Sequence, residues 1–170
     1  MNKIILVGFM GSGKTTIGKK LAKLLAIPFI DSDLEIERNT GMSIGKIFSV
    51  HGEAYFRNLE RSFILSLPES NFVLATGGGM PCVADNMSVL NELGTTLYLQ
   101  RSAKELAQRL KQAKNQRPLL EGLSEADLLQ YIDTKLAERE EYYRMAHFIL
   151  EREEQDPKII HQYLQPQRNS

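Results

Sequence analysis

The chain has 170 residues, of which 42% are hydrophobic and 25% charged, a composition typical of a folded domain rather than a disordered or fibrous protein. Its 21 basic and 21 acidic residues cancel, so no overall positive field attracts nucleic acid or an anionic membrane, and we expect neither as a partner. The first apolar run, Ile4 to Val7, is too short for the apolar core of a secretory signal. Because Cys82 is also the only cysteine, we expect a reduced, cytoplasmic compartment.

Short apolar or β-branched runs alternate with helical patterns along the chain. The runs predict strands at 3–7, 27–30, 71–75, 95–99 and 146–150. Apolar residues spaced three or four apart predict helices at 14–25, 53–67, 83–92, 103–111, 124–143 and 157–164. Strands that alternate with helices predict an α/β fold built on a parallel sheet.

Six of the twelve glycines fall in two clusters, and each cluster directly follows a predicted strand. The clusters are Gly8, Gly11 and Gly13 after the first strand, and Gly77–Gly79 after the strand at 71–75. The acidic stretch Asp31-Ser32-Asp33 follows the second predicted strand. Because ligands of parallel sheets bind beyond the carboxyl ends of the strands, we expect these three loops to converge on one site.

The first glycine cluster belongs to a phosphate-binding loop. Residues 8–15, Gly-Phe-Met-Gly-Ser-Gly-Lys-Thr, fit the pattern G-x-x-x-x-G-K-[ST] between a strand and a helix. The loop amides and the helix N-terminus attract phosphate oxygens, the lysine reaches the β- and γ-phosphates, and the threonine offers a hydroxyl to Mg²⁺. A glycine-rich turn that only caps a helix would need neither of these side chains. The residues assigned to the nucleotide here are Gly11, Ser12, Gly13, Lys14, Thr15 and Thr16.

A phosphate-binding loop occurs in kinases, switches and ATPases alike, so other motifs must separate these classes. The chain has no guanine-specific N-K-x-D stretch, and the strand at 71–75 runs into Thr76 rather than a metal-binding aspartate. Carboxylates instead follow the second strand, at Asp31 and Asp33. One can hold a metal-bound water and the other a substrate hydroxyl. Either can also cap the following helix, and the two roles are compatible.

Five further motifs follow the phosphate loop in a fixed order: Asp31-Ser32-Asp33, Phe56-Arg57, Ala75-Thr76-Gly77-Gly78-Gly79, Arg117-Pro118-Leu119-Leu120, and Arg139 before Tyr142-Tyr143. Over residues 2–150 this set resembles the shikimate kinases. The resemblance implies a single domain over 1–170 of the P-loop kinase type, similar to nucleoside monophosphate kinases. Its fold would be a three-layer sandwich with a five-stranded parallel sheet, a substrate-binding insertion at about 33–61 and a mobile lid at about 111–124.

The resemblance also implies a reaction. Shikimate kinases transfer the γ-phosphoryl group of ATP to the 3-hydroxyl of shikimate, on the route to chorismate and the aromatic amino acids. Mg²⁺ is the implied cofactor, ATP and shikimate are the implied partners, and a monomer is expected. Two other functions stay open from the residues themselves. One is a gluconate kinase-like enzyme, whose acceptor also bears a carboxylate and hydroxyls, and the other is a nucleotide-binding regulatory module without transfer activity.

Roles on the nucleotide side are carried over by the same resemblance. Lys14 is catalytic, and Thr15 and Asp31 serve the metal, with Asp31 acting through water. Arg109 resembles the residue that stacks on adenine. Arg117 resembles the lid arginine that binds ATP and reaches the transferring phosphate. The segment from Glu151 to Gln155 departs from the family pattern, so no adenine contact is assigned there.

Roles on the acceptor side come from the resemblance too. Asp33 contacts the acceptor hydroxyls and acts as the base, while Arg57 and Arg139 grip the carboxylate. Backbone contacts to the acceptor are assigned to Gly77, Gly78 and Gly79.

Taken without the resemblance, the arginines differ in what their surroundings indicate. Arg139 falls on the apolar stripe of its predicted helix, where a guanidinium either has a partner or extends from the edge of the core. Arg57 is predicted to be a surface side chain, although Glu60 could hold it through an i, i+3 contact. Arg117 lies in a polar stretch between about 111 and 124 that would by itself be an idle loop. The need to exclude water during phosphoryl transfer favours a mobile segment instead.

The histidines and methionines suggest no further chemistry. His51, His147 and His161 are too scattered to predict a metal triad. Four methionines are expected to pack in the interior, namely Met10, Met80, Met87 and Met145.

Overall fold

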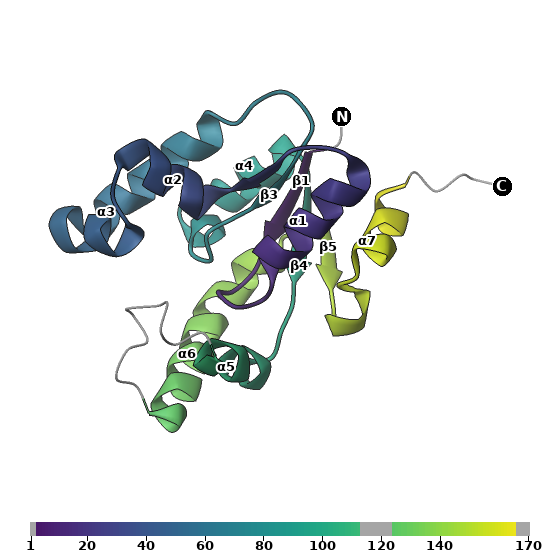
Figure 1. The fold of residues 1–170 in the computed structure, drawn as a ribbon. Helices are drawn as coiled ribbons and strands as arrows, with labels where there is room; N and C mark the ends of the chain where they lie inside the picture. The colour runs from purple at the N-terminus through teal and green to yellow at the C-terminus, as the bar shows by residue number, and fades with distance from the viewer. Residues whose placement is uncertain (1–2, 113–123, 166–170) are drawn as a thin grey trace.

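The computed structural model describes residues 3–112 and 124–165, and its sheet holds five strands (Figure 1). They are β1 (Lys3–Val7), β2 (Phe29–Asp31), β3 (Phe72–Ala75), β4 (Thr95–Leu99) and β5 (Phe148–Leu150). Their order across the sheet is β2-β3-β1-β4-β5, and every pairing is parallel. The predicted five-stranded parallel sheet is confirmed. Only β2 and β5 begin clearly later than the apolar runs suggested.

Helices cover both faces of this sheet, which confirms the three-layer arrangement. Ile4 and Leu6 of β1 pack on one face against α1 (Lys14–Leu25) and α7 (Pro157–Leu164). Ile5 and Val7 face the opposite layer, which holds α3 (Ile44–Leu65), α4 (Asn86–Leu93), α5 (Ala103–Gln112) and α6 (Glu125–Tyr143). Because both faces are covered, the central strands β1 and β3 are buried along their whole length.

Two helices lie between β2 and β3 and project to one side of the sheet in Figure 1. The first, α2 (Ser32–Thr40), was not predicted from the apolar spacing. It forms because Asp31 caps it, with Oδ1 accepting from the amides of Asp33 at 3.2 Å and Leu34 at 3.4 Å. The second, α3, begins at Ile44 rather than at 53 and is interrupted at Gly52, where φ is +80°. The predicted insertion at 33–61 falls on these two helices.

Two short 3-10 helices complete the described chain, η1 (Met80–Cys82) and η4 (Arg152–Glu154). Of the stretch predicted as a lid, only the ends are described. Lys111 near the end of α5 pairs with Glu125 of α6 at 2.8 Å, and Ser124 caps α6. Arg117 lies in 113–123, outside the described residues.

Two of the four methionines predicted to pack internally, Met80 and Met87, are fully buried, and Met10 packs partly buried against the core. The prediction is wrong for Met145, which is 48% exposed because it follows the end of α6. Among the helices in the described part of the chain, none is long and apolar enough to cross a membrane.

Candidate active site

The phosphate loop joins β1 to the N-terminus of α1. Gly8, Gly11 and Gly13 have φ of +139°, +81° and +108°, values that a residue with a side chain rarely adopts. The buried ammonium of Lys14 donates to the carbonyls of Gly8 at 2.7 Å and Phe9 at 2.9 Å. The lysine thus holds the loop in its curved form, with the positive end of the helix directed at the same space.

An open cavity of about 340 Å³ lies over this loop. Its walls come from the carboxyl ends of β1, β2 and β3, as predicted for the three convergent loops, and from α5. The lining residues are Met10, Gly11, Gly13, Lys14, Thr15, Thr16, Asp31, Asp33, Thr76, Gly78, Arg109 and Leu110.

Asp31 has two roles in the structure. One carboxylate oxygen caps α2, and the other accepts a hydrogen bond from the Thr15 hydroxyl at 2.9 Å. Hydroxyl and carboxylate oxygens are the ligands that Mg²⁺ prefers, so these residues fit the implied metal. No group of three or more His, Cys, Asp or Glu side chains suited to a metal occurs within 3–112 and 124–165. Mg²⁺ is usually bound by one or two protein oxygens together with water and phosphate, so the Thr15 and Asp31 pair suits it.

Asp33 reaches from the first turn of α2 to the second glycine cluster. A Cβ on Gly77 would lie only 2.5 Å from its Oδ1, so a side chain at that position would collide with the carboxylate. The Gly77 amide donates to the hydroxyl of Ser32 at 2.7 Å, which fixes this edge of the loop. Asp33 therefore lines the phosphate-loop cavity and also lies against the triple glycine.

Arg57 of α3 is held by two carboxylates of its own helix. It pairs with the exposed Glu53 at 2.8 Å and with Glu60 at 2.7 Å, and only 19% of its side chain is exposed. The prediction of a surface arginine is wrong, because the buried Glu60 draws the guanidinium inward against Gly79. The contact considered from the i, i+3 spacing is the one that forms. Burial raises the pKa of Glu60, and the hydrogen bond and charge of Arg57 only partly offset that rise.

Arg139, the other arginine that the resemblance assigns to the acceptor, lies on α6. Its guanidinium is half-buried and sits over the ring of Phe9 at 5.5 Å, so it is partnered by the phosphate loop itself. Its charge and that of Arg57 both lower the pKa of Glu60, which places the two cations around the same buried carboxylate. The structure thus brings together two guanidiniums from helices that are distant in the sequence.

Residues 10–167 match the family model described as shikimate kinase. The chain belongs to the shikimate kinase family. It is 46% identical over 150 residues to a shikimate kinase of Bacteroides fragilis, a match that covers 88% of this chain and 84% of that protein. It is also 42% identical over 155 residues to the shikimate kinase of Bacteroides thetaiotaomicron, covering 91% and 89% of the two chains.

Solved structures of shikimate kinases share the fold. The crystal structure of the Bacteroides thetaiotaomicron enzyme superimposes with a TM-score of 0.88 at 38% identity, covering 95% of this chain and 96% of that one. The Acinetobacter baumannii shikimate kinase in complex with shikimate gives a TM-score of 0.84 at 38% identity, covering 99% and 96%.

Arg109 lies on α5 beside the phosphate loop of this shikimate kinase family member. A Cβ on Gly13 would be 3.4 Å from its Nη2, so the guanidinium lies against the phosphate loop. Partial burial and the charge of Arg101 lower its pKa. Glu105 pairs with Arg101 at 3.2 Å and with Arg152 at 3.6 Å, which places a carboxylate between the cations of this region.

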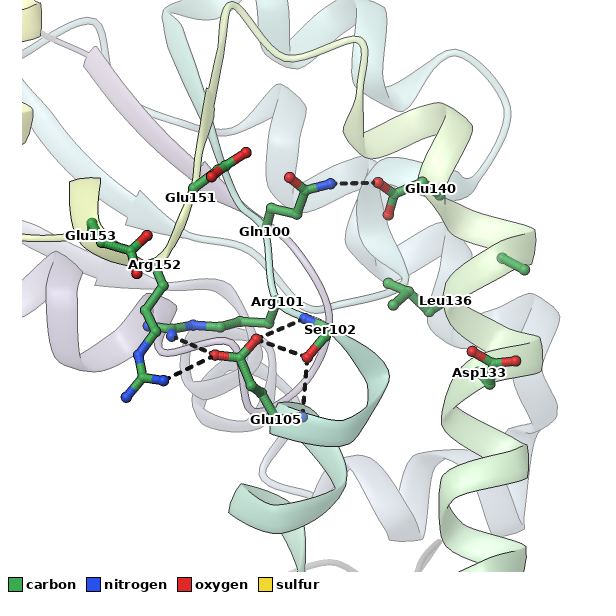
Figure 2. A pocket seen from close by; sticks show the side chains of 11 residues that line it. Gln100, Arg101, Ser102, Glu105, Asp133, Leu136, Glu140, Glu151, Arg152 and Glu153 are labelled. Atoms are coloured by element: carbon green, nitrogen blue, oxygen red, sulfur yellow. Dashed lines mark hydrogen bonds and ion pairs between the residues drawn. The ribbon is translucent and has the colours of Figure 1, made fainter.

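A second open cavity, of about 670 Å³, lies between α5, α6 and the ends of β4 and β5 (Figure 2). It is larger than the phosphate-loop cavity but shares no lining residue with it. Its walls carry two arginines and five carboxylates, namely Glu105, Asp133, Glu140, Glu151 and Glu153. An acidic surface repels phosphate, so the smaller cavity is the better place for a nucleotide.

Sequence reasoning missed two buried groups of the site. Tyr143 of α6 is fully buried and its hydroxyl donates to the carbonyl of Gly78 at 2.6 Å. The sequence analysis names Tyr143 only as part of a motif, and its i, i+4 spacing from Arg139 on the apolar stripe is the signal that could have found it. Ser32 was noted as part of an acidic motif and not as the partner of Gly77.

Proposed function

We propose that the protein phosphorylates the 3-hydroxyl of shikimate, with ATP as donor and ADP and shikimate 3-phosphate as products. Membership of the shikimate kinase family supports this reaction. The observation that carries the assignment of roles is the position of Asp33. It lines the phosphate-loop cavity and also abuts Gly77, so one carboxylate faces both the phosphate donor and the acceptor loop.

On the donor side, the loop amides of Gly11, Ser12 and Gly13 would bind the phosphates. Thr16 and Arg109 would add contacts to the nucleotide, with Arg109 lying over the adenine. The Lys14 ammonium, held at the loop by the carbonyls of Gly8 and Phe9, would bind a phosphate oxygen. These donors stabilise negative charge on the transferring group, which is the main requirement of phosphoryl transfer.

The Thr15 hydroxyl and the Asp31 carboxylate would hold Mg²⁺, with Asp31 acting through a bound water. Their oxygens are already within 2.9 Å of each other. When bound, the ion supplies positive charge to the β- and γ-phosphate oxygens. The capping role of Asp31 keeps its carboxylate pointed at this place.

On the acceptor side, Arg57 and Arg139 would bind the carboxylate of shikimate. Arg57 is pre-positioned by the buried Glu60, whereas its bond to Glu53 is to a side chain that is 67% exposed. A ligand carboxylate can displace such an exposed partner at little cost, because surface ion pairs contribute at most about 1 kcal/mol. The backbone of Gly77, Gly78 and Gly79 would complete the acceptor contacts.

Asp33 would accept the proton of the acceptor hydroxyl as its oxygen attacks the γ-phosphorus. A carboxylate within hydrogen-bond reach of that hydroxyl both orients the oxygen and removes the proton. The resemblance to the shikimate kinases implies a monomer, and we propose that state for this protein.

The reaction is tested by coupling ADP release to a panel of acceptors: shikimate, quinate, gluconate and nucleoside monophosphates. The expected result is turnover with shikimate, with the product identified as the 3-phosphate by phosphorus and proton NMR. Turnover with gluconate alone would favour the gluconate kinase-like alternative. Nucleotide affinity without turnover on any acceptor would favour a binding module.

A further inference from the structure

The hydroxyl of Tyr143 connects the two segments that form the proposed acceptor site, the glycine loop 77–79 and the helix α6. It donates to the Gly78 carbonyl at 2.6 Å across 65 residues of sequence. Arg139 lies one turn earlier on the same helix, α6, and its charge acts on this hydroxyl. The bond from Tyr143 therefore connects the glycine loop to the helix that carries Arg139.

The bond to Gly78 determines which way the glycine loop presents its amides. In a trans peptide the carbonyl and the next N–H point in opposite directions, so holding the Gly78 carbonyl also directs the Gly79 amide. Ser32 holds the loop from the other side through the Gly77 amide at 2.7 Å. A Cβ on Gly78 would lie 3.2 Å from the amide nitrogen of Met10, so the loop also packs on the phosphate loop.

The ring of Tyr143 has no freedom to move its hydroxyl elsewhere. It is fully buried and lies against the ring of Tyr98, with the centroids 5.1 Å apart. Burial raises the pKa of the Tyr143 hydroxyl well above its usual range, so the group stays a proton donor wherever the protein is folded.

Tyr98 offers a matched comparison. It is equally buried, and its hydroxyl donates to Glu140 at 2.6 Å. That bond connects β4 to α6 and does not reach the glycine loop. The two tyrosines therefore share burial, size and hydrogen-bond length, but only Tyr143 bonds to the glycine loop.

We propose that Tyr143 is a positioning residue for the phosphate acceptor, which keeps the Gly78 peptide and Arg139 in one fixed relation so that both contact shikimate together. The inference rests on the proposed function, because it concerns the acceptor site of that reaction. Tyr143 itself does not touch the reacting atoms. It acts through the loop and the helix that do.

The test compares Tyr143→Phe with Tyr98→Phe and the wild-type protein. Each substitution removes one hydroxyl and keeps the ring. For Tyr143→Phe we expect the KM for shikimate to rise about tenfold, as expected when a polar group loses its buried partner, while the KM for ATP and kcat change less than about threefold. For Tyr98→Phe both KM values should stay within about twofold of wild type. Circular dichroism and urea unfolding establish that all three proteins are folded.

The remaining outcomes would contradict either the positioning role of Tyr143 or the proposed function. A Tyr143→Phe protein that does not fold, or in which the KM values for shikimate and ATP rise together, would show that Tyr143 only supports the core, and would overturn the inference. An unchanged shikimate KM, or an equal rise in Tyr98→Phe, would overturn it as well. If the wild-type protein itself shows no turnover with shikimate, the proposed function fails, and the inference falls with it.

Discussion

The guanidinium of Arg57 donates to the carboxylate of Glu60 at 2.7 Å, and only 1% of the Glu60 side chain is exposed to solvent. A buried carboxylate next to an arginine that is itself mostly buried holds that arginine in one direction, because leaving the pair would strand a charge away from water. The direction is toward Gly79 and the interior of the proposed acceptor site.

This pair leads to a pH prediction. Since burial raises the pKa of Glu60, the carboxylate takes up its proton at a higher pH than an exposed glutamate. As pH falls through that raised pKa, Arg57 loses its buried counter-charge, and the KM for shikimate should rise. In Glu60→Gln the KM for shikimate should already be raised about tenfold at neutral pH, equivalent to about 1.4 kcal/mol. The further rise of this KM at acid pH should be absent, because the variant has no carboxyl to protonate at this position.

The Glu60 carboxyl should affect folding stability in the opposite direction to shikimate binding. A carboxyl whose pKa is raised on folding contributes stability at low pH, and this contribution is lost as pH rises through the folded-state pKa. Urea unfolding at neutral pH should therefore show no large loss of stability in Glu60→Gln.

Glu53→Gln, which removes the exposed partner of Arg57, is the control and should leave the pH profile of KM unchanged. Matching profiles for wild type and Glu60→Gln would contradict the prediction.

Lys14→Ala should abolish phosphoryl transfer while the protein stays folded. The ammonium is the charged donor nearest the phosphate loop carbonyls, and loss of one such donor typically lowers kcat by about 10² to 10³. The measurement is kcat by ADP release together with circular dichroism. Lys20→Ala, an exposed lysine of the same helix, should keep wild-type turnover. Normal kcat in Lys14→Ala would contradict the assigned role.

Asp31 and Asp33 should respond differently to amidation. Asp33→Asn should lower kcat by about 10² to 10⁴ even at saturating Mg²⁺, because the general base is lost. Asp31→Asn keeps the helix cap but weakens the contact with the metal, so its defect should depend on Mg²⁺ concentration. The measurement is a Mg²⁺ titration of both variants. Superimposable titration curves would contradict the division of roles.

Arg139→Lys should weaken the acceptor more than the nucleotide. A guanidinium can bind a carboxylate with two hydrogen bonds while stacked on Phe9, whereas a lysine offers only a point charge. We expect the KM for shikimate to rise about tenfold with little change in the KM for ATP. Arg144→Lys, at the exposed C-cap of the same helix, is the control. A rise in the KM for ATP alone would place Arg139 in the nucleotide site.

The thiol of Cys82 should react slowly with iodoacetamide. Burial raises its pKa to about 11, so little thiolate is present at neutral pH. The alkylation rate, followed by mass spectrometry, should keep increasing up to pH 10. Because Cys82 is the only cysteine, a single mass shift reports its modification. Fast labelling at pH 7 with a plateau below pH 9 would contradict the raised pKa.

The sequence by itself determined the parallel sheet and the phosphate loop. Both depend on residues that are close along the chain: the buried strands are continuous apolar runs, and the loop glycines, lysine and threonine lie within residues 8–15. Local backbone preferences and side-chain types are enough to specify such features. The missed helix α2 is a partial exception, because its start depends on the Asp31 cap more than on an apolar period.

The tertiary structure alone decided the surroundings of the proposed metal and acceptor sites. Thr15 meets Asp31 across 16 residues, and Tyr143 meets Gly78 across 65. A local sequence pattern predicts neither contact, because both depend on how the ends of separate strands and the helix α6 pack together. For Arg57 the i, i+3 spacing did indicate the partner, Glu60, but only the packing of α3 buries Glu60 and turns the guanidinium away from the surface. Long-range burial, and not residue type, gives these side chains their direction and their charge environment.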